Sequence, residues 1–251
     1  MKASLFRAPL ALLVLVSAII TLPAAAQGIG RGALRNVVGA CVVAKSTLGL
    51  AFPCADVRLD SPGADGYAII RSPGFSSEFL LAPTAPMDGI ESSALETDAA
   101  TGFWQAAWAA RQNVSDTLGH PLGRTDVALA VNASGTRTQD HFHIHVDCVR
   151  QSVIQVLSTR AKAISDQWAP FPARLQGETY WVRTVAGADL GGVNVARLIA
   201  DAPQKVTQPI GHATLALVGA KLADGSDGFY LLANWANSSA ERLLDHDCKG
   251  R

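Results

Sequence analysis

The stretch from Val127 to Cys148 reads VALAVNASGTRTQDHFHIHVDC. It starts with an apolar run, continues through a polar turn that contains Gly135, and ends in three histidines that alternate with apolar residues. Alternation with a period of two is typical of a β-strand, whose successive side chains point to opposite faces. The stretch therefore predicts two neighbouring antiparallel strands, 127–131 and 141–148, joined by the polar turn.

Three histidines share one face of the second predicted strand. His141, His143 and His145 lie on that face together with Asp147, while the apolar residues between them face a core. Imidazoles titrate near neutral pH and bind metals, so three of them on one face indicate a chemical site. Three solvated histidines on an edge strand are the alternative without a function.

Two kinds of chemistry use alternating histidines. Neutral imidazoles two residues apart on a strand can converge on one zinc ion and leave a position open for water. Alternatively, one imidazole attacks phosphorus in line and forms a phosphohistidine, while its neighbours stabilise the phosphate oxygens. The turn before the strand favours the second chemistry, because its hydroxyls, its amides and Arg137 can all donate to phosphate oxygens. We therefore expect no metal and no cofactor, with zinc binding as the alternative.

The chain has 251 residues, 49% of them hydrophobic, with 21 basic and 21 acidic residues. This length and composition allow a folded domain with a substantial core. The balanced charge provides no basic field that would attract nucleic acid, so we expect no nucleic-acid partner.

Residues 1–26 have the pattern of a signal peptide or an N-terminal membrane anchor. Lys2 and Arg7 form a short basic region, residues 8–22 carry no charge, and small residues follow. The uncharged stretch is shorter than the roughly 20 residues that span a bilayer comfortably. The sequence therefore predicts export of a mature domain, 27–251, and leaves cleavage and anchoring both open.

The four cysteines are Cys41, Cys54, Cys148 and Cys248. In an exported protein an even number of cysteines indicates disulfides, and four cysteines allow three connectivities. Cys41 with Cys54 is the local pairing, which leaves Cys148 with Cys248 and would fix the C-terminal tail to the end of the histidine strand. Four buried free thiols are the alternative.

Short apolar runs separated by turn residues dominate the rest of the chain. We predict an α+β fold in which helices pack on one face of an antiparallel sheet. Expected strands also cover 66–71, 78–82, 179–185, 213–221 and 228–234, and expected helices cover 30–50, 98–119, 152–168 and 238–245. Faint similarity among the strand sequences leaves two explanations open, an internal pseudo-repeat at 177–251 or chance.

The motif His-Phe-His-Ile-His-Val at 141–146 resembles the histidine triad signature, in which three histidines alternate with hydrophobic residues after a strand and a glycine-containing turn. The surrounding sequence is similar to the bacterial CDP-diacylglycerol pyrophosphatases over almost the whole mature chain. The similar segments are Asn132 with 135–139, 148–150, Pro83-Thr84, 89–92, Phe103-Trp104, Ala107-Trp108, the pair Cys41 and Cys54, and 245–248.

This resemblance implies a histidine-triad-like sheet and hydrolysis of CDP-diacylglycerol to CMP and phosphatidate. The site would face the periplasm at the inner membrane, so the implied partners are the lipid nucleotide and the membrane surface. The resemblance also implies that His143 is the nucleophile, that His141 orients it mainly through its backbone carbonyl, and that His145 supports the phosphate. An exported nucleotide hydrolase or nucleotidyl transferase of the same fold is the alternative enzyme.

The resemblance further implies phosphate contacts from the turn. Asn132 and Thr138 match the positions whose amide and hydroxyl contact phosphate oxygens, and Gln139 belongs to the same set of donors. We add Arg137 on its charge alone, as a ligand for the second phosphate. The oligomeric state, the acyl chains and the reading of the base stay open.

The remaining histidines are expected to be structural. His120 lies in a predicted loop and His212 precedes an apolar strand. His246 is the first of them to test, because a Cys148–Cys248 disulfide would bring it near the histidine strand.

Overall fold

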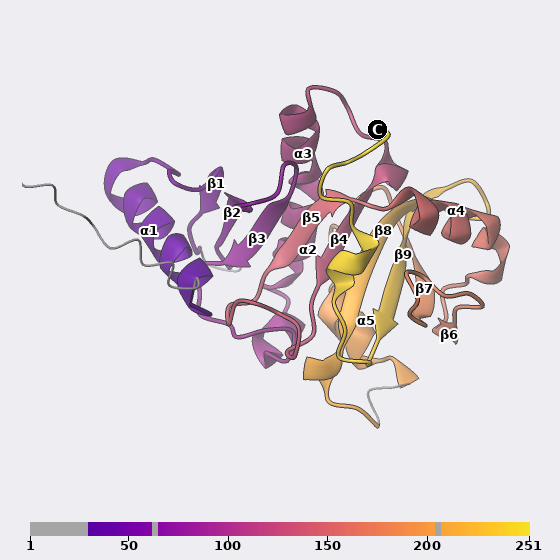
Figure 1. The fold of residues 1–251 in the computed structure, drawn as a ribbon. Coiled ribbons are helices and arrows are strands. Elements are labelled where there is room, and N and C mark those ends of the chain that lie inside the picture. The colour runs from indigo at the N-terminus through magenta and orange to yellow at the C-terminus, as the bar shows by residue number, and fades with distance from the viewer. Residues whose placement is uncertain (1–29, 62–64, 204–206) are drawn as a thin grey trace, which may run out of the picture.

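One antiparallel sheet of nine strands organises the residues that the computed structural model describes, which are 30–61, 65–203 and 207–251 (Figure 1). The strand order is β1-β2-β3-β5-β4-β8-β9-β7-β6. The strands are β1 (Asp56–Arg58), β2 (Tyr67–Arg71), β3 (Phe79–Pro83), β4 (Val127–Val131), β5 (Ile144–Cys148), β6 (Ala169–Pro170), β7 (Trp181–Ala186), β8 (Thr214–Lys221) and β9 (Asp227–Asn234). The predicted leader, 1–26, lies outside the described residues.

Helices and short 3-10 turns connect and cover the strands. The α-helices are α1 (Ala33–Leu48), α2 (Thr101–Ala109), α3 (Arg111–Leu118), α4 (Gln151–Thr159) and α5 (Val195–Ala200). The 3-10 turns are η1 (Ser93–Glu96), η2 (Arg124–Asp126), η3 (Ala161–Ala163), η5 (Ile210–His212) and η6 (Ala240–Leu243). Within the described part of the chain, no helix is both long enough and apolar enough to cross a bilayer.

The two strands predicted around the polar turn are both present, as β4 and β5. β5 lies between β3 and β4, so that His145 is opposite Leu80 on one side and Ala130 on the other. The strand begins at Ile144 rather than at His141. The residues before it leave the ladder, and the N–H of Phe142 donates instead to the carbonyl of Met87, at 2.7 Å.

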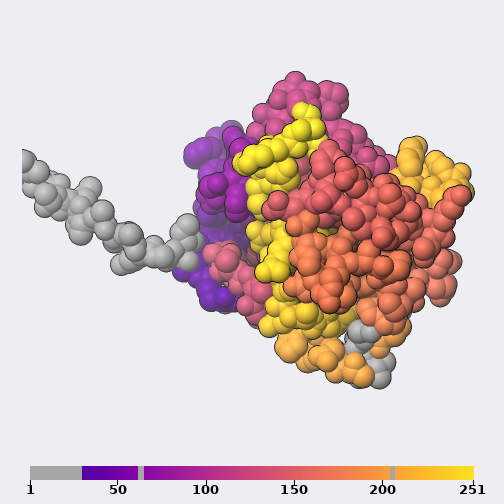
Figure 2. Space-filling model, turned by 45° about the vertical axis from the view of Figure 1, so that its right-hand side comes forward, coloured from indigo at the N-terminus to yellow at the C-terminus, as the bar shows by residue number. Residues whose placement is uncertain are grey.

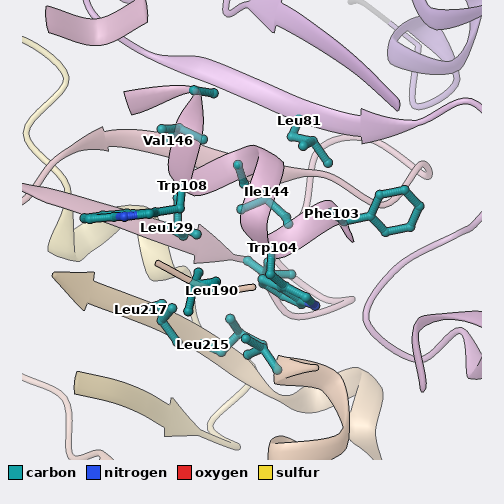
Figure 3. Close-up of a cluster of buried hydrophobic side chains, with 14 of the residues drawn as sticks. Leu81, Phe103, Trp104, Trp108, Leu129, Ile144, Val146, Leu190, Leu215 and Leu217 are labelled. Carbon is teal, nitrogen blue, oxygen red and sulfur yellow. The ribbon is translucent and has the colours of Figure 1, made fainter. Parts of the chain in front are cut away.

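The main core covers one face of the sheet, under α2, α3 and α5. Figure 3 shows Trp104 and Trp108 among aliphatic side chains from the strands. Both tryptophans are almost completely buried, and Phe142 and Ile144 join them from the histidine segment. The apolar side of the alternating motif therefore faces a core, as its period predicted.

The opposite face carries two separate apolar clusters. α1 buries Leu34, Val38 and Cys41, spaced as one helical stripe, against β1, β2 and β3. α4 buries Val153 and Leu157 against β4, β8 and β9. Helices thus pack on both faces, and the prediction of one face was wrong. An amphipathic period shows that a helix has an apolar stripe, but not which side of the sheet the stripe covers.

The C-terminal segment runs along β5 between these two clusters. Figures 1 and 2 show this segment, in yellow, crossing the surface between the N-terminal third and residues 150–190. The N–H of Asp245 donates to the carbonyl of Cys148, and Val149 pairs with Leu244. A disulfide between Cys148 and Cys248 links the C-terminal segment to the end of β5, and a second disulfide joins Cys41 to Cys54.

Several boundaries differ from the predictions. The expected helix 98–119 is two helices, α2 and α3, which meet at Ala110. The expected helix 152–168 ends at Thr159, and 238–245 forms only the 3-10 turn η6. β1, β6 and α5 were not predicted. β7, β8 and β9 extend the sheet beyond β4, and the pseudo-repeat at 177–251 stays a prediction.

Candidate active site

His143 has one ring nitrogen fixed and the other available. Its Nδ1 lies 2.7 Å from the carbonyl oxygen of His141. Because a carbonyl can only accept a hydrogen bond, Nδ1 carries the proton and Nε2 keeps its lone pair. Burial, together with the nearby charge of His145, lowers the pKa of His143 to about 3. The ring is therefore neutral at physiological pH, in the tautomer that suits a nucleophile.

His141 is fixed by the end of β3. Its Nε2 lies 2.8 Å from the carbonyl oxygen of Pro83, to which it donates. The side chain is 1% exposed, and burial lowers its pKa below the usual histidine value. His141 thus makes two hydrogen bonds, in which its ring donates to Pro83 at the end of β3 and its carbonyl accepts from the ring of His143.

His145 forms a buried ion pair with Glu78. Its Nδ1 lies 2.8 Å from Oε1 of Glu78, a residue just before β3 that is 1% exposed. Burial acts to lower the pKa of His145, but the hydrogen bond and the charge of Glu78 outweigh it, so this pKa is raised. Burial likewise acts to raise the pKa of Glu78, and His145 outweighs it in the other direction. Both shifts favour the form of the pair in which Glu78 is a carboxylate and His145 an imidazolium.

A second pair lies behind the first. Nδ1 of His246 is 2.8 Å from Oδ2 of Asp147 and 3.4 Å from Oε1 of Glu78. Ser77 donates to the other oxygen of Asp147 at 2.7 Å. Burial acts to lower the pKa of His246, and its hydrogen bond to Asp147 outweighs this, so that its pKa is raised. His246, which was expected to be structural but was the first of the outlying histidines to test, therefore lies in the site.

Asn132 joins the site to the C-terminal segment. Its Oδ1 accepts from the N–H of Ala240 at 2.8 Å and from the hydroxyl of Ser239 at 3.2 Å. These donors fix the orientation of the amide, so its Nδ2 points to Oε1 of Glu241, 2.5 Å away, and towards Nε2 of His145, 3.4 Å away. Oε1 of Glu241 also lies 3.5 Å from Nε2 of His145, so the two ring nitrogens of His145 face Glu241 and Glu78.

The polar turn is held mainly by contacts with its neighbours. Arg137 binds both carboxylate oxygens of Glu91, at 2.7 and 2.8 Å, and its Nε lies 3.2 Å from Asp140. A Cβ on Gly89 would collide with the guanidinium of Arg137, so only glycine allows this close approach. Arg137 was predicted, on its charge alone, to bind the second phosphate, and in this structure it is already paired with two carboxylates.

The other turn residues have separate roles. Oε1 of Gln139 accepts from the N–H of Leu34 in the first turn of α1, at 2.9 Å. Arg31 binds both oxygens of Asp140, at 2.6 Å each. Thr138 is exposed at the surface. The turn therefore fixes the start of α1 beside the histidines.

A small pocket opens beside His143. It gathers four of the seven residues predicted for catalysis or phosphate binding, namely His141, His143, Asn132 and Arg137. His145 lies next to it, with its ring centroid 4.8 Å from that of His143. Thr138 and Gln139 are not part of the lining. The full lining is Gly89, Ile90, Val131, Asn132, Arg137, His141, Phe142 and His143.

The three histidines do not converge on one point. Among the described residues, two clusters without disulfide-bonded cysteines could hold a cation. One is Glu78 with His145 and Glu241, and the other is Glu78 with Asp147 and His246. Each cluster contains only one histidine, and neither includes His141 or His143, whose rings donate to backbone carbonyls. This geometry disagrees with a zinc site built on the three alternating histidines.

Sequence reasoning missed the two glutamates of the site. Glu78 is 67 residues from its partner His145, and Glu241 is 109 residues from Asn132. Neither belongs to a local motif. For Glu78 the signal was a charged residue at the edge of an apolar strand, and such residues are usually exposed.

The comparison with known proteins covers this whole site. Residues 30–251 match the family described as CDP-diacylglycerol pyrophosphatase. A protein of Yersinia pestis named "CDP-diacylglycerol pyrophosphatase" is 34% identical over 203 residues, which cover 78% of this chain and 76% of the relative. With the histidine strand, its turn and the C-terminal segment all inside the matched range, the chain belongs to the CDP-diacylglycerol pyrophosphatase family.

Proposed function

We propose that this chain hydrolyses CDP-diacylglycerol to CMP and phosphatidate, with His143 as the nucleophile. Membership of the family supports the substrate and the bond that is cut. One observation carries the choice of nucleophile. The hydrogen bond from Nδ1 of His143 to the carbonyl of His141 leaves Nε2 unprotonated beside the pocket.

The reaction proceeds in two displacements. The lone pair of Nε2 attacks the cytidylyl phosphorus, the bond to the bridging oxygen breaks, and phosphatidate leaves with the electron pair. The cytidylyl-imidazole is cationic, because Nδ1 keeps its proton, and the carbonyl of His141 stabilises that charge. Water then attacks phosphorus and loses a proton to solvent, the N–P bond breaks with its electron pair returning to Nε2, and CMP and neutral His143 are released.

His145 supplies positive charge beside the nucleophile. Its raised pKa favours the imidazolium form, and its ring centroid lies 4.8 Å from that of His143. A fixed cation at this distance stabilises the charge that develops on the phosphate oxygens during each displacement. Glu78 and Glu241 hold this ring and limit its movement, so they act as positioning residues.

The pH dependence of kcat/KM follows from these two histidines. With the pKa of His143 lowered to about 3, the nucleophile stays neutral between pH 7 and pH 5, and kcat/KM should not fall across that range. The pKa of His145 lies above its usual value of 6.5, so activity should fall only when pH rises through that raised value.

Glu78→Gln tests this assignment. The variant loses the charge that raises the pKa of His145, and the alkaline limb should therefore move to lower pH. Steady-state kcat/KM for both proteins from pH 5 to pH 10 provides the measurement. An acid limb centred near 6.5 in the parent protein would mean that His143 titrates like an exposed histidine, contrary to the proposal.

Arg137→Met should raise KM more than it lowers kcat. The guanidinium lines the pocket, and losing a charged hydrogen bond costs about 1.5–3 kcal/mol, or roughly 10- to 100-fold in kcat/KM. Because Glu91 and Asp140 neutralise Arg137 in this structure, the substrate phosphate must compete with them. Glu91→Gln is the matched control and should lower KM. Unchanged kinetics in Arg137→Met would remove Arg137 from the phosphate site.

Product analysis tests the activity itself. Purified protein should convert CDP-diacylglycerol into equal amounts of CMP and phosphatidate. Cleavage of soluble nucleotides such as CDP-alcohols or dinucleoside phosphates at a higher kcat/KM would instead favour the exported nucleotide hydrolase.

We place this reaction at the periplasmic side of the inner membrane. The export pattern in residues 1–26 supports this location, as do the two disulfides, because disulfides persist in oxidising compartments. Fractionation of cells that express the full chain, with protease added to intact spheroplasts, tests it.

A further inference from the structure

The end of α1 exposes four large apolar side chains. Val43 is 61% exposed, Leu48 70%, Leu50 57% and Phe52 78%, and we call these four residues the apolar tip. Across the described residues, every large hydrophobic side chain that is exposed falls between residues 43 and 75. Single exposed hydrophobic residues are ordinary, whereas a concentration of them in one segment marks an interaction surface.

The apolar tip is held in place by covalent and backbone bonds. The disulfide Cys41–Cys54 ties the loop after α1 back to the third turn of the helix. Gly49 ends the helix in the left-handed conformation, at φ 73°, and the N–H of Leu50 donates to the carbonyl of Ala44. Both half-cystines are buried in the cluster under α1. The exposed side chains therefore project from a rigid loop that cannot fold them inward.

The charge around the apolar tip points to a lipid surface. From residue 36 to residue 55 the chain contains no carboxylate, and Lys45 is its single charged residue. Apolar side chains with a cation and no anion suit the interface of an anionic bilayer, into which such side chains insert while the cation meets the headgroups. Protein interfaces, by contrast, usually surround their apolar core with a polar rim.

α1 connects the apolar tip to the active site. Its first turn contacts the polar turn before the histidines, where the N–H of Leu34 donates to Gln139, and its 16 residues extend about 24 Å to the apolar tip. In Figure 1, α1 (indigo) forms one end of the molecule, away from the strands β8 and β9.

We propose that the apolar tip inserts into the lipid interface and holds the catalytic face at the bilayer that contains the substrate. This inference rests on the proposed function, because a diacyl lipid substrate is what places a bilayer beside the site. The occupant is an anionic phospholipid surface, and a second copy of this chain or another protein is the competing outcome.

Tryptophan quenching in vesicles tests the location of the apolar tip. Phe52→Trp in the full chain is mixed with phosphatidylcholine and phosphatidylglycerol vesicles whose acyl chains carry bromine. The added tryptophan should be quenched and blue-shifted, relative to the parent protein with its five tryptophans. Gln155→Trp, on the exposed side of α4, is the matched control and should not be quenched. Equal quenching at both positions, or none at position 52, would overturn the proposal.

Kinetics then separate the membrane contact from the chemistry. The double variant Leu50→Ser/Phe52→Ser should bind vesicles roughly 100-fold less tightly, about tenfold for each side chain of this size. It should lose activity on CDP-diacylglycerol in vesicles to a similar degree and keep its activity on a short-chain, monomeric CDP-diacylglycerol. Phe52→Leu should keep both activities. Undiminished activity of the double variant on vesicles would refute the role of the apolar tip.

The two proposals can fail separately. If the parent protein hydrolyses neither form of the substrate but position 52 is still quenched, the proposed function is wrong and the membrane contact stands. If both forms are hydrolysed but a second copy covers the apolar tip, sedimentation would show a dimer that Leu50→Ser/Phe52→Ser dissociates, and the membrane contact is wrong.

Discussion

Replacing His143 by alanine is expected to reduce kcat for CDP-diacylglycerol hydrolysis by at least ~10³-fold, as when an enzyme loses a nucleophile or a major electrostatic contribution. The reason is local. His143 has Nδ1 occupied by the carbonyl of His141, a pKa lowered to about 3, and its side chain in the pocket wall. Steady-state assays of purified protein, with CMP as the measured product, give the size of the loss.

The control for His143→Ala is His120→Ala. His120 is exposed in the loop after α3, and its removal should leave kcat unchanged. Because His143 is 6% exposed, thermal unfolding of the variant must show that the fold is intact. More than a tenth of the parent activity in a folded His143→Ala protein would rule out a nucleophilic role.

A covalent intermediate distinguishes the nucleophile from a general base. Rapid acid-free quenching followed by mass spectrometry should find a cytidylyl group on the peptide that contains His143. The same peptide without the group, at a time when product is forming, would mean that water attacks phosphorus directly. In that case the neutral Nε2 of His143 would act as the base that activates the water.

The alternating histidines could be predicted because their pattern is local. A period of two fixes which side chains share a face, and the apolar partners Phe142 and Ile144 do pack in the core. The same reasoning placed β4 before the turn and β5 after it. It could not show that the segment leaves the ladder before Ile144, because that depends on the carbonyl of Met87 in a distant loop.

The support around His145 could not be predicted because it comes from distant segments. Glu78 reaches this histidine from the position just before β3, and Glu241 reaches it from the C-terminal segment. Each is an isolated acidic residue in the sequence, and burial of a glutamate is unfavourable unless a partner is known. The position of His246 near the histidine strand could be predicted only by assuming a disulfide between Cys148 and Cys248.

Arg137 shows a different limit. Its charge suggested a ligand for the second phosphate, but the side chain is 11% exposed and paired with Glu91 and Asp140. A sequence identifies charges without showing which of them neutralise one another. Its role in phosphate binding therefore depends on whether substrate displaces these carboxylates, which the kinetics of Arg137→Met and Glu91→Gln measure.

Removing the disulfide between Cys148 and Cys248 is expected to lower the free energy of unfolding by about 4–5 kcal/mol. The two residues are 100 positions apart, and a cross-link that closes a loop of this size removes much of the conformational entropy of the unfolded chain. Cys148→Ala/Cys248→Ala is the suitable variant, because both side chains are buried and serine would place a hydroxyl in the core. Urea unfolding with linear extrapolation measures the change.

The disulfide between Cys41 and Cys54 provides the matched comparison. Its loop spans 13 positions, for which the same relation gives about 3 kcal/mol. Equal losses of unfolding free energy in Cys41→Ala/Cys54→Ala and Cys148→Ala/Cys248→Ala would contradict the dependence on loop length.

The two variants that lack a disulfide should differ more in kcat than in their free energy of unfolding. Cys148 follows Asp147, and Cys248 lies two residues after His246, so the longer cross-link also holds the imidazole that Asp147 and Glu78 share. Without it, Glu241 and His246 can move away from His145, and kcat should fall even in urea-free buffer where the variant is folded. The variant that lacks the Cys41–Cys54 disulfide keeps this contact and should retain kcat on a monomeric substrate. An unchanged kcat in Cys148→Ala/Cys248→Ala would show that η6 and the bridge of Val149 with Leu244 position the segment without the cross-link.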